Sequence, residues 1–114
     1  MAIAVAASRQ TVANAYAGLG VYIGVCTADP GTTSTPANET SGSSYTRVAT
    51  TWTPGTIGTE AGSACTISTP AGTFTYVLLA SGVSGNNMVD KTSVTSTTLS
   101  SPGQLVVTPN YTQT

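Results

Sequence analysis

Short runs of β-branched and aromatic residues, each ended by a Gly/Pro turn, make up most of this chain. Proline fixes φ and glycine accepts a positive φ at such turns. The turns stand at Asp29–Gly31, Pro54–Gly55, Pro70–Gly72 and Pro102–Gly103. About six to eight short strands lie between them, and no βαβ alternation is present. We therefore predict an all-β fold, an antiparallel β-sandwich or jelly-roll-like domain with one short N-terminal helix, spanning residues 1–114 as a single unit.

The strand signals differ in strength along the chain. The run Thr73–Ala80 is the most strand-like and is predicted to be the central strand, and Trp52 is the largest candidate for the core. A polar stretch, Thr32–Ser44, has no periodicity, which is typical of loops that carry function or lack order. The other predicted strands are Val21–Thr27, Tyr45–Trp52, Ala64–Ser68, one or two within Met88–Leu99, Gln104–Thr108 and an edge strand at Pro109–Thr112.

A helix signal lies near the N-terminus. The segment from Ile3 to Leu19 is rich in alanine and has no proline, so we predict a helix over Ser8–Ala17 with Ser8 as its N-cap. Gly18 is placed to stop it. We expect this helix to cover one end or edge of a sheet.

Charged residues are almost absent and the apolar runs are short, which excludes nucleic-acid binding and membrane spanning. The chain has 3 Lys plus Arg, 4 Asp plus Glu and no His, whereas ordinary globular chains carry about a quarter charged residues. Arg9, Arg47 and Lys91 are too far apart to form a basic patch, so nucleic-acid binding is excluded. The longest apolar runs are far shorter than the ~20 residues of a membrane helix, so a membrane-spanning helix is excluded as well.

The segment Met1–Ala7 lacks the basic leader of a signal peptide, which predicts synthesis in a bacterial cytoplasm.

Hydroxyl side chains stand where charges are missing. Thr occurs 23 times and Ser 13 times, a composition like that of the β-rich outer surfaces of viral shells and fibres. A secreted β domain is the other class that this composition fits.

The residues needed for catalysis are scarce, so we predict that the chain is not an enzyme and uses no cofactor or metal. No His is present, and neither Cys26 nor Cys65 has a base to activate it. The two cysteines show no CxxC spacing and are predicted to be buried free thiols, with a single disulfide as the alternative. A calcium site at Asp29 and Glu39 has no supporting ligand spacing. A glycosidase pair drawn from the four carboxylates is likewise unsupported.

Two of these acidic residues have structural interpretations. Asp29, before Pro30-Gly31, is expected to bond backbone amides in its turn. Arg47 is predicted to pair with Glu39 or with Asp29 across the base of the long loop; its alternative is a solvated strand residue.

Several segments follow one another in an order that resembles a family of small structural proteins of tailed phages. In that family a helix and a strand precede a T-x-D-P-G turn, an N-E-x-x-G-x-x-Y-x-R segment and a Trp-bearing strand. Such proteins are frequent in phages of actinobacteria and are labelled tail-fibre or minor structural proteins. The resemblance is clear through the first half and continues weakly beyond it. Its segments are Asn14–Gly20, Val25–Thr33, Asn38–Ala49, Thr69–Tyr76 and Leu105–Pro109.

The resemblance implies a bacteriophage virion structural protein. A free-standing chain of this size favours a head-decoration (minor capsid) protein that stabilises the shell, and the alternative is a tail-tip or tail-fibre module for host attachment. The expected partners are further copies of the chain, as a homo-oligomer such as a trimer, and the major capsid protein or tail proteins. Binding is expected through edge strands and extended termini. The residues expected to bind partners are Asp29, Pro30, Gly31, Glu39, Tyr45 and Arg47 in the long loop, Ile3 and Val5 in the N-terminal arm, and Pro109 and Tyr111 in the tail. Mobile surface segments are the alternative interpretation.

A carbohydrate-binding module is a third class, because β-sandwiches often present aromatic rings to sugars. Trp52 and five tyrosines are available, although most stand at strand positions that predict burial. An exposed coplanar pair of rings would favour this class, and a buried Trp52 would argue against it.

Overall fold

The computed structural model describes residues 1–114 as one helix and nine strands, which confirms the predicted all-β, sandwich-like fold. All strand pairs are antiparallel, in sheets of order β2-β1-β6-β7, β3-β4-β9 and β5-β8. The helix is α1, Ala6–Ala17. The strands are β1 Tyr22–Cys26, β2 Val48–Ala49, β3 Trp52–Pro54, β4 Thr59–Gly62, β5 Cys65–Thr69, β6 Gly72–Ala80, β7 Met88–Leu99, β8 Gly103–Val107 and β9 Asn110–Thr112.

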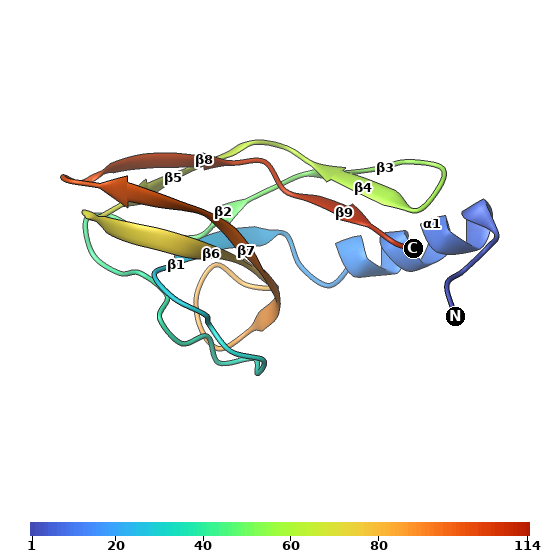
Figure 1. The fold of residues 1–114 in the computed structure, drawn as a ribbon, viewed down its shortest axis with the longest axis horizontal. Coiled ribbons are helices and arrows are strands. Elements are labelled where there is room, and N and C mark those ends of the chain that lie inside the picture. The colour runs from blue at the N-terminus through green and yellow to red at the C-terminus, as the bar shows by residue number, and fades with distance from the viewer.

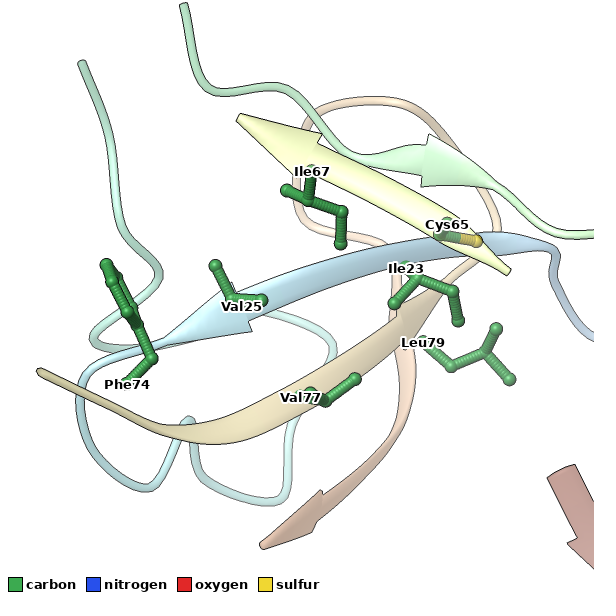
Figure 2. Close-up of a cluster of buried hydrophobic side chains, with 7 residues drawn as sticks. All are labelled: Ile23, Val25, Cys65, Ile67, Phe74, Val77 and Leu79. Atoms are coloured by element: carbon green, nitrogen blue, oxygen red, sulfur yellow. The ribbon is translucent and has the colours of Figure 1, made fainter. Parts of the chain in front are cut away.

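Two layers enclose the core. The four-stranded sheet forms one layer, and the β5-β8 pair lies over it, continued toward the helix by β3, β4 and β9 (Figure 1). Side chains from β1, β5 and β6 point toward one another between the layers (Figure 2). The cluster contains Ile23, Val25, Cys65, Ile67, Phe74, Val77 and Leu79. Phe74 is the largest fully buried side chain, whereas Trp52 is half-buried at the margin, so the choice of Trp52 as the main core residue was wrong.

Strand β6 is the central strand, as predicted, because it lies between β1 and β7 and is buried on both faces. Val77 and Leu79 point into the sandwich, and Leu78 and Ala80 belong to a second cluster with Cys26 and Met88. Burial on both faces explains why the second half of this strand, Tyr76–Ala80, has a continuous apolar sequence, whereas Thr73 and Thr75 alternate with apolar residues in its first half.

The predicted strand Tyr45–Trp52 is wrong as a single element. The chain crosses from one sheet to the other at Thr50, which is buried; its N–H donates to the Val21 carbonyl at 2.8 Å and its hydroxyl to the Ser63 carbonyl at 2.8 Å. These bonds fix a corner, leaving β2 in the four-stranded sheet and β3 in another. Pro54, predicted to be in the turn, lies in β3, an edge strand where its missing N–H is tolerated. Strand β4 was not predicted.

The helix begins earlier than predicted. Its N-cap is Val5, which offers no side-chain cap, and Ser8 lies inside the first turn, so the assignment of Ser8 as N-cap was wrong. The helix ends at Ala17 as expected and packs against β3 and β4, at one end of the sandwich. No helix of the structure is long and apolar enough to cross a membrane. Both termini lie at this helical end (Figure 1).

The two cysteines are free and buried, which confirms the thiol prediction over the disulfide. They belong to different clusters, Cys65 between the layers and Cys26 on the opposite face of the four-stranded sheet. Burial, with a smaller contribution from the charge of Glu39, raises the pKa of Cys26 to about 12. Both thiols therefore act as small core side chains.

Phe74→Ala should lower the free energy of unfolding by about 3–5 kcal/mol, because it removes a fully buried ring and leaves a cavity. Val106→Ala is the control, since Val106 is 67% exposed; its effect should stay within about 0.5 kcal/mol. Urea unfolding followed by circular dichroism measures both. Equal effects of the two substitutions would contradict the placement of the core.

Candidate functional site

The ten residues predicted to bind partners separate into four places in the fold. Glu39, Tyr45 and Arg47 come together at the base of the long loop, and the turn Asp29–Gly31 lies apart from them. The remaining four lie at the two chain ends.

Arg47 is the centre of the first group and is only 4% exposed. Its Nε and Nη2 donate to the two carboxylate oxygens of Glu39, each at 2.9 Å. Nη1 donates to the Gly82 carbonyl at 3.0 Å and to Asn87 Oδ1 at 2.7 Å, and Nη2 also donates to the Gly85 carbonyl at 3.0 Å. One guanidinium therefore joins the long loop to the β6–β7 loop, and the predicted pairing of Arg47 with Glu39 is confirmed.

Tyr45 fixes the same carboxylate to the sheet. Its hydroxyl donates to Glu39 Oε2 at 2.6 Å and accepts the N–H of Val25 at 3.1 Å. A Cβ at Gly24 would lie 2.5 Å from this hydroxyl, so only glycine permits the approach. A backbone hydrogen bond from the Thr40 N–H to the Val25 carbonyl, 3.1 Å, completes the attachment of the loop to β1. The polar stretch Thr32–Ser44 is therefore held by specific contacts at its base.

The charges in this network stabilise one another. Burial raises the pKa of Glu39, but hydrogen bonds from Arg47 and Tyr45 outweigh it and hold this pKa below its usual range. Burial, reinforced by the hydrogen bond to Glu39, raises the pKa of Tyr45. The ionised pair with a neutral tyrosine is thus the favoured state.

Asp29 bonds a backbone amide in its turn, as predicted, but its ion-pair partner is not the predicted one. Asp29 Oδ1 accepts the N–H of Gly31 at 2.9 Å, Gly31 has φ of 94°, and Pro30 is buried. The carboxylate forms an ion pair with Lys91 on β7 and not with Arg47, so that alternative is excluded. The hydrogen bond from Lys91 lowers the pKa of Asp29.

The chain ends take up two separate positions. Ile3 is half-buried and its carbonyl accepts a hydrogen bond from Arg9 at 2.9 Å, while Val5 is 61% exposed. Pro109 and Tyr111 are half-buried and line a cleft at the open side of the sandwich. The N-terminal arm therefore presents an apolar side chain to solvent, and the tail forms part of a concave surface.

The cleft has a volume of about 410 Å³ and lies between β7 on one side and the chain from Val107 to Thr112 on the other. These two walls belong to different sheets. The buried side chains of Ile23, Val77 and Leu79 form its floor, and Tyr16 and Trp52 contribute rings from α1 and β3. The cleft therefore ends on the core, whose side chains are almost fully covered.

Three aromatic rings meet in the cleft. Tyr16 stacks on Tyr111 with ring centroids 3.7 Å apart and an interplanar angle of 10°, and it meets Trp52 edge to face at 6.2 Å and 73°. The Tyr16 hydroxyl donates to Asp90 Oδ2 at 2.6 Å, and Trp52 Nε1 donates to the Gly20 carbonyl at 2.9 Å. Burial and then the hydrogen bond to Asp90 raise the pKa of Tyr16.

Of these residues, only Pro109 and Tyr111 were predicted as site residues. Tyr16 and Asp90 were missed, because nothing local in the sequence joins a helical tyrosine to a strand carboxylate. Neither condition set for a carbohydrate module is met as stated: Trp52 is half-buried, and Tyr16 and Tyr111 stack on each other instead of lying side by side. No three His, Cys, Asp or Glu side chains gather as metal ligands.

Arg47→Met should lower the free energy of unfolding at pH 7 by about 3–5 kcal/mol, because it leaves the Glu39 carboxylate without its cation. The wild type has a lowered Glu39 pKa, so its stability from this group is present above the unfolded value of about 4.3 and falls as the pH drops through the folded pKa. In the variant, burial outweighs the remaining hydrogen bond from Tyr45 and raises the pKa of Glu39, so acid removes the penalty. The difference in the free energy of unfolding between the wild type and Arg47→Met, measured by urea unfolding, should therefore become smaller from neutral to acidic pH.

Lys91→Met is the matched control, since it also removes the cation of an ion pair but at an exposed site. Its effect should stay within about 1 kcal/mol. If the difference in the free energy of unfolding between Arg47→Met and the wild type does not change with pH, the charge of Glu39 does not contribute to it.

Comparison with known proteins gives one match. The family model Gp80, described as podophage GP4 fiber I protein gp80, matches residues 4–112. The searches of curated proteins and of solved structures gave no match. The family name supports the phage-structural and tail-fibre parts of the sequence resemblance, and it does not bear on actinobacterial phages or on a minor capsid role. Because the match spans the helix and all nine strands, the chain belongs to the family of the podophage GP4 fiber I protein gp80.

Proposed function

We propose that this chain is a structural component of a phage tail fibre, and that it acts in host attachment by binding, without catalysis. The observation that carries this proposal is the fibre-family match over residues 4–112. The shape is compatible with it, since the molecule measures 47 × 25 × 23 Å and is about twice as long as it is wide. The proposal also implies that the chain is a component of the virion.

Assembly with further copies is the second part of the proposal, and the edge strand β7 supports it. This strand has twelve residues and pairs only with β6, and every side chain from Thr92 to Thr98 is exposed. Proteins usually protect such edges with charges or proline, yet the only charges in β7 are Asp90 and Lys91, near its start. Its outer edge is therefore free to pair with the same edge of another copy.

Head decoration was the function favoured by the sequence, with the tail fibre as the alternative. The family name supports the alternative, and neither the cleft nor the strand edges favour attachment to a capsid. We therefore place the fibre first and treat a capsid location as an outcome of the test.

Cryo-EM of the virions that contain this chain should place its density in a fibre, in the small number of copies that fibres supply. The 47 Å length and the single helix at one end give a recognisable outline for fitting. Density in hundreds of copies on the capsid surface would contradict the fibre role and support decoration.

Thr95→Lys should weaken self-association by about tenfold or more, because it places a charge on the unpaired edge of β7. Sedimentation velocity over a range of protein concentrations measures the effect. Ala15→Lys adds the same charge on the exposed face of α1 and should leave self-association unchanged. If the wild type is monomeric throughout, or if both variants behave alike, pairing through β7 is wrong.

A further inference from the structure

The open side of the sandwich carries an inference that rests on the proposed role in attachment and goes beyond it. We propose that the cleft between β7 and β8–β9 is a binding site for a neutral saccharide, with Trp52 and Tyr111 as its apolar contacts and Asp90 as its main hydrogen-bond acceptor.

The dimensions of the cleft suit a small ligand. Its volume of about 410 Å³ lies in the range of about 300–1,000 Å³ that is usual for small-molecule sites. The walls come from both layers, so the folded sandwich sets the width of the cleft. A ligand of one or a few sugar rings would therefore meet a preformed surface.

The aromatic side chains provide the apolar half of saccharide recognition. A pyranose ring has faces made of C–H groups, and these pack against the electron-rich face of an aromatic ring. Trp52 and Tyr111 are each half-buried and line the cleft. Tyr16 stacks against Tyr111 and supports its orientation from behind.

The polar side chains provide the other half. Each oxygen of the Asp90 carboxylate accepts one donor within the protein, Oδ2 from Tyr16 and Oδ1 from the Lys91 N–H. A carboxylate has about four acceptor positions, so Asp90 can accept further hydrogen bonds from ligand hydroxyls. Thr92 and Asn110, exposed on opposite walls, can donate and accept.

The charges favour a neutral ligand. The ammonium group of Lys91 is paired with Asp29, so it does not offer a free cation to the cleft. Asp90 is then the only carboxylate in the lining, and it disfavours acidic sugars. A ligand that carries many hydroxyl donors and no charge needs no cation from the protein and is not repelled by Asp90.

A strand of another copy is the competing occupant, because β7 and β8 both have a free edge here. A strand of another copy would cover Asp90 with few donors aimed at it, because its N–H groups pair with the edge strand and its side chains are fixed by the register, and an unpaired buried carboxylate carries a large desolvation cost. Sugar hydroxyls supply those donors. The carboxylate inside the cleft therefore favours the saccharide.

The single tryptophan makes the test specific for this site, since Trp52 lines the cleft and no other indole is present. The intact chain would be titrated with neutral oligosaccharides built from glucose, galactose, mannose, rhamnose and N-acetylglucosamine, while the fluorescence and the indole N–H NMR signal of Trp52 are followed. At least one should give a saturable change in both.

Three variants complete the experiment. Tyr111→Ala should weaken binding of that saccharide roughly tenfold through the loss of ring contact, and Asp90→Asn roughly fivefold through the loss of a charged acceptor. Tyr22→Ala removes a half-buried tyrosine outside the cleft and should bind as the wild type does. The shape-conserving Asp90→Asn change keeps the test valid if Tyr111→Ala is unstable.

The inference would be overturned if no saccharide of the panel changes the Trp52 signals. It would also be overturned if the signals depend on protein concentration alone, as strand insertion by another copy requires. Equal binding by the wild type, Tyr111→Ala and Asp90→Asn would overturn it as well. Virion imaging reports on the fibre role independently. A fibre protein that binds no sugar would leave the proposed function standing and refute the saccharide site.

Discussion

The arrangement of this protein depends on one buried cation in a chain that has few charges. The guanidinium of Arg47 makes five hydrogen bonds to groups in two loops that are far apart in sequence. Without it, the Glu39 carboxylate in the loop after β1 and the carbonyls of Gly82 and Gly85 in the loop after β6 would lose these donors. Burying this cation is favourable only because its donors are satisfied. The outer face of β1 and β6 can therefore remain apolar beneath two polar loops.

Local chemistry explains which parts of the fold could be predicted from the sequence. The Asp29 turn depends on residues next to one another, and the central position of β6 follows from its continuous apolar run, so both were found. The corner at Thr50 depends on Val21 and Ser63, which lie in other parts of the chain. The sequence pattern from Tyr45 to Trp52 resembles that of one long strand. β4 has few apolar residues, and its Glu60 is buried against the helix side of the sheet, which no periodicity indicates.

The cleft could not be predicted because its members come together only on folding. Tyr16 and Asp90 are separated by most of the chain and by two types of secondary structure. The arginine pair was easier to predict, because a chain with so few cations offers few partners to each carboxylate. Scarcity of charge thus made the Arg47–Glu39 pair predictable from the sequence. The aromatic and hydroxyl surfaces, which carry the proposed binding, had no distinctive sequence signal.

The position of the two termini has a mechanical consequence. Both ends lie beside α1, while the β5–β6 and β7–β8 turns lie together at the opposite tip, as the pairing of Thr69 with Gly103 requires (Figure 1). Tension applied through the two ends would act first on α1 and on β9, which holds β4 through three residue pairs. The sandwich beyond them would bear little of the load. A support can therefore anchor this protein by either end and still leave the far tip unobstructed.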